Sequence, residues 1–192
     1  MSGNNVRPGA DRRTFIGSAA LGLFTFQIAG CGKLLSPRDA RLQGAPIDHF
    51  SPDESDILSG FGEALVPGAR QAGIVHYVDA NLGRPPGESL LTARYLDILP
   101  PHADFYRAGL KALEAHAIRQ FGKPFVKAAA AEQDALIAPM LGGNVPGWSG
   151  PPAPLFYLAV RSDAADLVYG TQAAFARMNV PYAAHIEPPS DW

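Results

Sequence analysis

The sequence predicts an all-α protein that consists of a single small helical domain with long irregular N- and C-terminal segments. Apolar residues recur at helical spacing in several segments of the 192-residue chain. Proline and glycine, present 18 and 20 times, interrupt these segments and favour short helices joined by irregular connectors. No segment alternates apolar and polar residues clearly enough to predict a strand. We therefore expect about five to seven helices packed around one core.

The first helix is predicted from a strong start signal. Ser51 can cap its N-terminus, and Pro52 suits the first helical position. Glu54 completes a capping box with Ser51. Gly122 is placed to end the longest helix, and Pro139 should kink or end a later one. The further helices are predicted over residues 72–82, 89–99, 102–120, 128–141, 155–169 and 171–178.

The N-terminus has the features of a twin-arginine export signal over residues 1–30. Arg12 and Arg13 are adjacent, and Phe15 follows two positions later. Residues 16–30 are uncharged and only mildly apolar. This run is shorter than the roughly 20 residues that span a bilayer as a helix, so it predicts a signal rather than an anchor. Because the twin-arginine route moves folded proteins, we expect a periplasmic protein that holds a cofactor or travels with a partner that does.

Cys31 is the single cysteine of the sequence, and Ile28-Ala29-Gly30 before it resembles a bacterial lipobox. Small residues before the thiol suit a signal peptidase, and the thiol can accept a diacylglycerol. One cysteine cannot form an intrachain disulfide. We expect lipidation of Cys31, and the alternative is an unmodified cysteine in a spacer or one removed with the signal. Residues 31–50 are predicted to be a spacer, and residues 51–192 a helical partner-binding domain.

The residues alone assign no catalytic, cofactor-binding or metal-binding position. A single cysteine excludes covalently attached c-type haem and a cysteine-ligated iron–sulfur cluster. Gly60-Phe61-Gly62 lacks the third glycine of a dinucleotide site and lies within a helical pattern. Asp163 and Asp166 are predicted to lie on a solvated helix face rather than to act as a general acid and base. The formal net charge is -2, so nucleic acid is not an expected partner.

Two segments are unusually apolar or aromatic for a small solvated domain. Residues 155–160 are apolar all round, which predicts a helix buried on every side, and in a small domain this burial suggests a second chain. The tail over residues 180–192 places aromatic residues among prolines. It is expected to dock on a partner or to fold back on its own core. The residues predicted to contact a partner are Phe156, Tyr157, Tyr169, Tyr182, His185, Ile186 and Trp192.

Several short blocks follow one another through the part of the chain after the signal. They cover residues 57–67, 72–79, 106–110, 121–125, 132–136, 166–170 and 180–186. In this order, and behind a twin-arginine signal, the blocks resemble those of the gluconate 2-dehydrogenase subunit 3 family. Members of that family are the small subunits of bacterial periplasmic, flavin-dependent sugar and polyol dehydrogenases, including the FAD-dependent glucose dehydrogenase complex.

The resemblance implies a role that the residues alone do not assign. The large partner, which is similar to glucose–methanol–choline oxidoreductases, would hold FAD and oxidise a sugar or polyol. A multihaem cytochrome subunit with haem c would take the electrons to the respiratory chain. This chain would be the non-catalytic small, or gamma, subunit that binds the large subunit and carries it through the twin-arginine translocon. The resemblance transfers no catalytic residue to this chain.

Two alternatives remain open at this point. His76, Asp79 and His102 could form a metal or acid–base site in a small exported enzyme, and a stoichiometric metal in the purified chain would reveal it. The histidines form no i, i+4 pair, so surface or capping roles are the simpler interpretation. The second alternative is an exported lipoprotein that binds other envelope proteins. A neighbouring gene for a large flavoprotein would favour the dehydrogenase subunit over both.

Overall fold

The structure is a computed structural model, and it describes residues 23–28 and 30–180. Within these ranges the chain is mostly helical, as predicted, with one two-stranded sheet. No helix in the described ranges is long and apolar enough to cross a membrane. The elements are β1 (Phe24–Ile28), β2 (Cys31–Leu35), α2 (Pro37–Leu42), α3 (Pro52–Leu65), α4 (Ala69–Ala72), α5 (Ile74–Leu82), η1 (Pro86–Glu88), α6 (Thr92–Tyr95), α7 (His102–Phe121), η2 (Phe125–Lys127), α8 (Ala130–Leu141), α9 (Ala153–Tyr169) and α10 (Gln172–Arg177).

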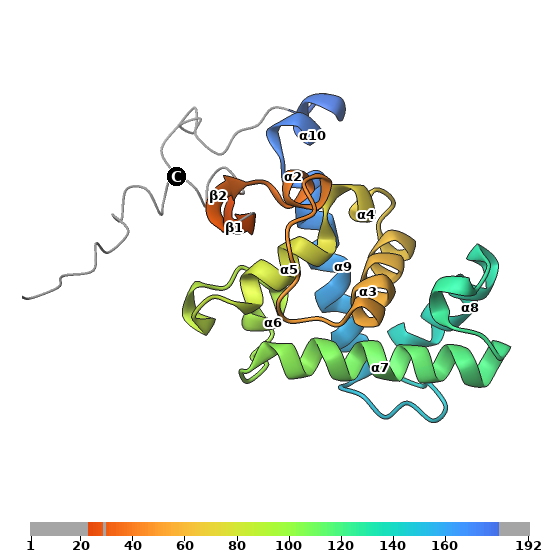
Figure 1. The fold of residues 1–192 in the computed structure, drawn as a ribbon. Helices are drawn as coiled ribbons and strands as arrows, with labels where there is room; N and C mark the ends of the chain where they lie inside the picture. Colours follow the sequence, from red (N-terminus) through yellow and green to blue (C-terminus); the bar gives the residue numbers. More distant parts are fainter. Residues whose placement is uncertain (1–22, 29, 181–192) are drawn as a thin grey trace, which may run out of the picture.

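Helix α9 is the centre of the fold. It contacts α3, α4, α5, α6, α7 and α8, and Figure 1 shows it between α3 and α5 with α7 crossing near its start. Phe156, Ala159, Val160 and Ala164 are fully buried along α9. The apolar run at residues 155–160 is therefore covered largely by helices of the same chain. This arrangement corrects the expectation that its burial needs a second chain.

Helix α7 approaches α9 closely because Gly109 has no side chain. A Cβ added at Gly109 would lie 2.3 Å from Cδ2 of Phe156, which is too short for a real contact. The Phe156 ring stacks in turn on Phe61 of α3, with 5.4 Å between ring centroids and 13° between ring planes. One phenylalanine ring thus joins α3, α7 and α9 in a single apolar core.

The predicted starts and ends of several helices are confirmed. Ser51 Oγ accepts a hydrogen bond from the N–H of Glu54 at 3.3 Å, and the Glu54 carboxylate accepts one from the N–H of Ser51 at 2.8 Å. Gly122 follows the last residue of α7 in the left-handed region, with φ of 66°. Helix α8 continues through Pro139 to Leu141, so this proline does not end it.

The helix predicted over residues 89–99 is wrong, because only α6 is helical there. Ser89 and Leu91 are extended, with ψ of 139° at both residues, and Asp97 has φ of 55°. The N–H of Leu90 donates to Asn81 Oδ1 at 2.9 Å, and the N–H of Thr92 donates to an Asp163 carboxylate oxygen at 2.8 Å. These long-range hydrogen bonds fix the backbone in a path that local helix propensity does not predict.

The expectation that the chain has no strands is also wrong. Strands β1 and β2 pair antiparallel, from Phe24 opposite Leu35 to Ile28 opposite Cys31. Phe24 and Phe26 are buried, whereas the intervening side chain of Thr25 is exposed. Strand β1 therefore has the two-residue alternation of a half-buried strand, within residues that also fit the pattern of an export signal.

Residues 31–50, predicted to be a spacer, are part of the folded domain. They contain β2 and α2, and α2 packs against α5. Ser36 caps α2 by accepting the N–H of Asp39 at 3.1 Å. Ala45 and Phe50 are buried in the core. In Figure 1 the hairpin, α2 and α10 lie on the side of the molecule opposite to α7.

Candidate functional site

A buried carboxylate holds the connection between α5 and α7 against the central helix. Asp163 of α9 is fully buried, and it accepts hydrogen bonds from Tyr106 Oη at 2.5 Å and from the N–H of Thr92 at 2.8 Å. Burial raises the pKa of Asp163 to about 6, although both hydrogen bonds favour the charged form. The expectation that Asp163 lies on a solvated face is wrong, while Asp166 is exposed as expected.

Asn81 holds the same connection from the side of α5. Its side chain is 1% exposed, and its Nδ2 donates to the Tyr77 carbonyl at 2.8 Å. Its Oδ1 accepts the N–H of Leu90 at 2.9 Å. Both polar ends of this amide are therefore satisfied inside the chain. Asn81 and Asp163 position the loop and do not present free groups to a ligand.

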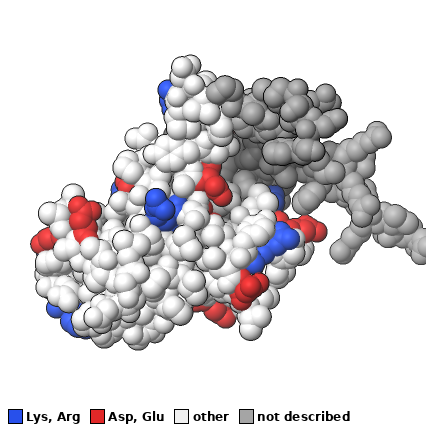
Figure 2. All heavy atoms as spheres, turned by 180° about the vertical axis from the view of Figure 1, so that it is seen from behind, with Lys and Arg blue, Asp and Glu red and all other residues white. Residues whose placement is uncertain are grey.

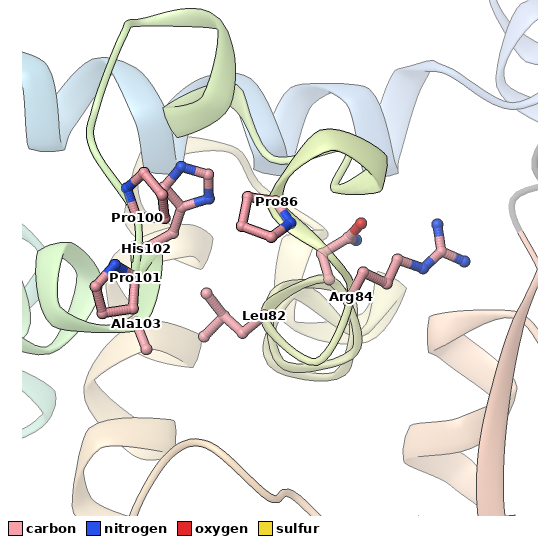
Figure 3. A pocket seen from close by; sticks show the side chains of 8 residues that line it. Leu82, Arg84, Pro86, Pro100, Pro101, His102 and Ala103 are labelled. Atoms are coloured by element: carbon pink, nitrogen blue, oxygen red, sulfur yellow. The ribbon is translucent and has the colours of Figure 1, made fainter.

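A pocket of about 330 Å³ lies between this loop and the start of α7. Its walls are mostly apolar, and Figure 3 shows the rings of Pro86, Pro100 and Pro101 around it. The Arg84 side chain extends away from these rings. The His102 ring is engaged through Nε2, which lies 3.0 Å from the Ile98 carbonyl oxygen. This proline pocket suits an apolar side chain better than it suits acid–base chemistry.

The structure does not assemble His76, Asp79 and His102 into a metal site. The Asp79 carboxylate accepts the N–H of Asp48 at 3.1 Å and the N–H of His49 at 2.7 Å. His76 Nε2 lies 3.1 Å from the Ala45 carbonyl oxygen, and burial lowers the pKa of His76. The described ranges contain no group of three or more histidine, cysteine or acidic residues that could hold a metal ion. The side chains of His76, Asp79 and His102 therefore form hydrogen bonds with backbone groups of the same chain.

A larger groove, about 600 Å³ in volume, lies among the hairpin, α2, α4 and the end of α9. Arg38, Asp166 and Arg177 contribute charged groups of both signs to its lining. The adjoining end of the molecule exposes apolar side chains at Tyr169 (45%) and Met178 (46%). We call Tyr169, Met178 and Val180 the C-terminal surface, because it is the last part of the chain that the structure describes.

The residues predicted to contact a partner differ in their exposure to solvent. Phe156 is fully buried inside this chain, so its assignment to an interface is corrected to the core. Tyr157 is half-buried, and Tyr169 is exposed at the end of α9. Cys31 is exposed as the first residue of β2. The predicted residues outside the described ranges are Arg12, Arg13, Phe15, Tyr182, His185, Ile186 and Trp192.

Sequence reasoning missed several exposed apolar side chains. Leu99 is 84% exposed and Tyr95 is 66% exposed, both in the connection between α5 and α7. The predicted helix over residues 89–99 would instead have included both residues in regular helical structure. The Pro100-Pro101 pair directly after Leu99 is the signal that an irregular, exposed segment was to be expected there.

Charge does not single out a binding surface on the face of the molecule that Figure 2 shows. Figure 2 shows one face on which acidic and basic groups are scattered and separated by wide uncharged areas. The whole sequence has 16 basic and 18 acidic residues, so its overall charge is nearly balanced. On this face, shape and apolar contact are therefore the stronger basis for recognition.

Comparison with known proteins identifies the family of the chain. A family model described as gluconate 2-dehydrogenase subunit 3 matches residues 48–183, which include α3 to α10. The match leaves out β1, β2 and α2, all of which precede residue 48. Searches of curated proteins and of solved structures returned no match. The model covers well over half of the sequence, and the chain therefore belongs to the gluconate 2-dehydrogenase subunit 3 family.

Proposed function

We propose that this chain is the non-catalytic small subunit of an exported, membrane-associated dehydrogenase complex. In this complex a large flavoprotein subunit holds FAD and oxidises a sugar or polyol, and a cytochrome c subunit receives the electrons. The small subunit binds the flavoprotein and escorts it through the twin-arginine translocon to the periplasm. Membership of a family of dehydrogenase subunits supports the partnership.

The observation that carries the proposal is the Arg12-Arg13 pair at the start of a chain of this family. The twin-arginine route moves folded proteins, so one signal can serve an assembled complex. The buried side chains of Asn81, Asp79 and Asp163 hold the fold of this chain through backbone groups and a tyrosine. Because the family is described as a subunit of a dehydrogenase, we assign the dehydrogenase chemistry to the partner.

We assign contact with the flavoprotein to the C-terminal surface and to the tail that continues from it. Tyr169 and Met178 are exposed apolar residues at one end of the molecule. Val180, also 46% exposed, leads directly into the segment that contains Tyr182, Ile186 and Trp192. Tyrosine and tryptophan are enriched among the residues that dominate interface energies. We infer that these residues and the tail contribute to one contact with the flavoprotein.

Co-purification tests the proposed contact. Affinity purification of the full chain is expected to recover a large FAD-containing subunit, identified by mass spectrometry and by flavin absorbance. Tyr169→Glu should reduce the recovered flavin, because it places a charge in the apolar contact. Leu141→Glu is the matched control, because Leu141 is 60% exposed on α8, far from α10 in Figure 1. Absence of a flavoprotein, or equal losses in both variants, would contradict the assignment.

The membrane association is proposed to involve Cys31. The thiol is exposed at the start of β2, so it is accessible for the attachment of a diacylglycerol. Mass spectrometry of the exported protein provides the test. A lipid-modified N-terminal cysteine is the expected species, and an unmodified N-terminus downstream of Cys31 would show that attachment to the membrane depends on a partner instead.

A further inference from the structure

Strand β1 is part of the predicted export signal and also part of the folded domain. Its residues, 24–28, lie within the predicted export signal, and they also form a strand that packs on the helical domain. Phe24 is 2% exposed and Phe26 is 7% exposed. Their side chains cannot lie in the domain and contact the export machinery or the membrane at the same time. The position of β1 therefore determines whether this part of the signal is accessible.

The surface that receives β1 consists of His76 and Tyr77 of α5 and of Arg84, and we call it the leader seat. The Phe24 ring meets the Tyr77 ring edge to face, with 5.7 Å between centroids and 88° between planes. The Arg84 Cζ lies 4.5 Å from the centroid of Phe24, a cation–π contact. The Phe26 ring meets the His76 ring with 6.1 Å between centroids. The two aromatic rings of β1 thus have separate partners.

Two of the three residues of the leader seat, His76 and Tyr77, are held by contacts within the domain. Tyr77 Oη donates to the Leu90 carbonyl oxygen at 3.2 Å. The His76 ring contacts the Ala45 carbonyl oxygen through Nε2 at 3.1 Å. Because these hydrogen bonds do not involve residues 24–28, we expect the seat to persist when β1 is absent. It then has the properties of a binding site for an extended segment with aromatic residues at alternate positions.

We propose that the leader seat binds the apolar part of this chain's own export signal and withholds it from the translocon until β1 leaves α5. The inference rests on the proposed function in one respect, that residues 1–30 direct export. It concerns a part of the chain outside the family match, which begins at residue 48. The ligand of the site is the segment Phe24–Ile28 in its extended form.

The energetics suit a contact that opens without unfolding the domain. A sheet of two strands has little stability by itself, so β1 depends on its aromatic contacts. Burial of two phenylalanine side chains is opposed by the conformational entropy of fixing five residues, and these free energies are of the same order. The central core around Phe61 and Phe156 does not involve β1 in its ring stacking. Phe24 and Phe26 belong to the same buried cluster as Phe61 and Phe156. We therefore expect release of β1 to uncover its own edge of the core and to leave the stacked Phe61–Phe156 pair in place.

Disulfide trapping tests whether β1 keeps its place in the hairpin in the full chain in solution, and the same cysteine pair combined with Arg84→Ala tests whether the seat helps to hold it there. Thr25 and Leu34 are exposed and directly opposite in the hairpin, so Thr25→Cys with Leu34→Cys places two thiols within reach of a bond. Cys31→Ser removes the native thiol. The matched control combines Gln27→Cys with Leu34→Cys, because Gln27 is exposed on the same strand but lies opposite Gly32. Faster oxidation of the first pair is expected, and Arg84→Ala should slow it because it removes a contact of the seat with Phe24. Equal rates of the two pairs, or an unchanged rate in Arg84→Ala, would overturn the proposal.

Translocation into inverted membrane vesicles tests the consequence for export. The oxidised Thr25→Cys, Leu34→Cys protein is compared with the same protein after reduction, and uptake is measured as protection from added protease. The oxidised form should lose translocation and reduction should restore it, because the bond holds β1 in the hairpin. Equal uptake of the two forms would overturn the proposal. A wild-type chain that is never taken up would contradict the proposed export function instead, and the effect of Arg84→Ala on the trapping rate would still decide whether the seat holds β1.

Discussion

Gly109 of α7 and Phe156 of α9 are in direct contact, with the aromatic ring occupying the space where a side chain at position 109 would begin. A Cβ there would lie 2.3 Å from Cδ2 and 2.4 Å from Cε2 of the ring. Gly109→Ala should therefore lower the free energy of unfolding by about 1–3 kcal/mol, the usual effect of an overpacked core. Urea denaturation monitored by circular dichroism measures this change.

Two further variants separate this contact from a general effect of adding a methyl group. Gly87→Ala is the control, because an added Cβ at Gly87 meets no atom within 4 Å. Its free energy of unfolding should change by no more than about 0.5 kcal/mol. Phe156→Leu combined with Gly109→Ala should lower the free energy of unfolding by less than the sum of the two single changes. The smaller leucine side chain leaves room for the Cβ at position 109. Additive costs would show that the two residues are not coupled.

The buried Asp163 predicts a pH dependence of stability with a defined sign. Burial raises its pKa from the ordinary value of 3.8 to about 6, so the folded chain binds this proton more tightly than the unfolded chain. The contribution of Asp163 to the free energy of unfolding is therefore largest below pH 3.8 and declines as the pH rises to about 6. Asp163→Asn should remove this decline, as measured by urea denaturation between pH 4 and 7 in comparison with wild type.

Tyr106 provides a second variant on the same hydrogen bond. The hydroxyl of Tyr106 donates to Asp163 and favours its charged form, so it opposes the effect of burial on the pKa. Tyr106→Phe should raise the pKa of Asp163 further and extend the decline in stability to higher pH. A profile that is unchanged in Tyr106→Phe would show that the hydroxyl does not govern the titration of Asp163.

His76 predicts the opposite slope. Burial lowers the pKa of His76 below its ordinary value of 6.5, so the unfolded chain binds the proton more readily than the folded chain. The stability that depends on neutral His76 is complete above pH 6.5 and is lost as the pH falls below that value. His76→Gln keeps a donor for the Ala45 carbonyl and does not titrate. Its melting temperature should fall less than that of wild type between pH 7.5 and pH 5.

Ser51 tests the local signal that predicted α3. Its hydroxyl accepts the N–H of Glu54, and replacement by alanine removes this cap. Ser51→Ala should lower the free energy of unfolding by about 1 kcal/mol. Ser51→Asp keeps an acceptor at the N-cap and is expected to retain most of the stability. Equal losses in the two variants would show that capping is not the role of Ser51.

The sequence predicts those elements whose signals are local. The cap at Ser51 and the left-handed Gly122 both depend on residues within one turn of the helix end, and both are confirmed. The short helix α6 was not predictable in this way, because Asp163 binds the backbone of Thr92 from 71 residues away. Asp163 itself looked solvated for the same reason, since its partners come from other segments of the chain.

Strand β1 shows a different limit of sequence interpretation. Its alternation is local and visible in Phe24-Thr25-Phe26, but the same residues also satisfy the pattern of an export signal. The structure adds the contact with Tyr77, which comes from α5 and could not be inferred from spacing. Tyr169 is exposed, and its contact with a partner stays a prediction. Phe156 could be placed in the core only with knowledge of its contacts with Gly109 and Phe61.

The most direct test of the proposed function is the location of the flavoprotein when the arginine pair is changed. Arg12→Lys with Arg13→Lys preserves charge, and Arg7→Lys is the control outside the pair. Cell fractions are assayed for FAD-dependent sugar or polyol dehydrogenase activity and for the large subunit. The double variant should retain the large subunit in the cytoplasm, whereas Arg7→Lys should leave it in the periplasm. Undiminished periplasmic activity in the double variant would contradict the escort function.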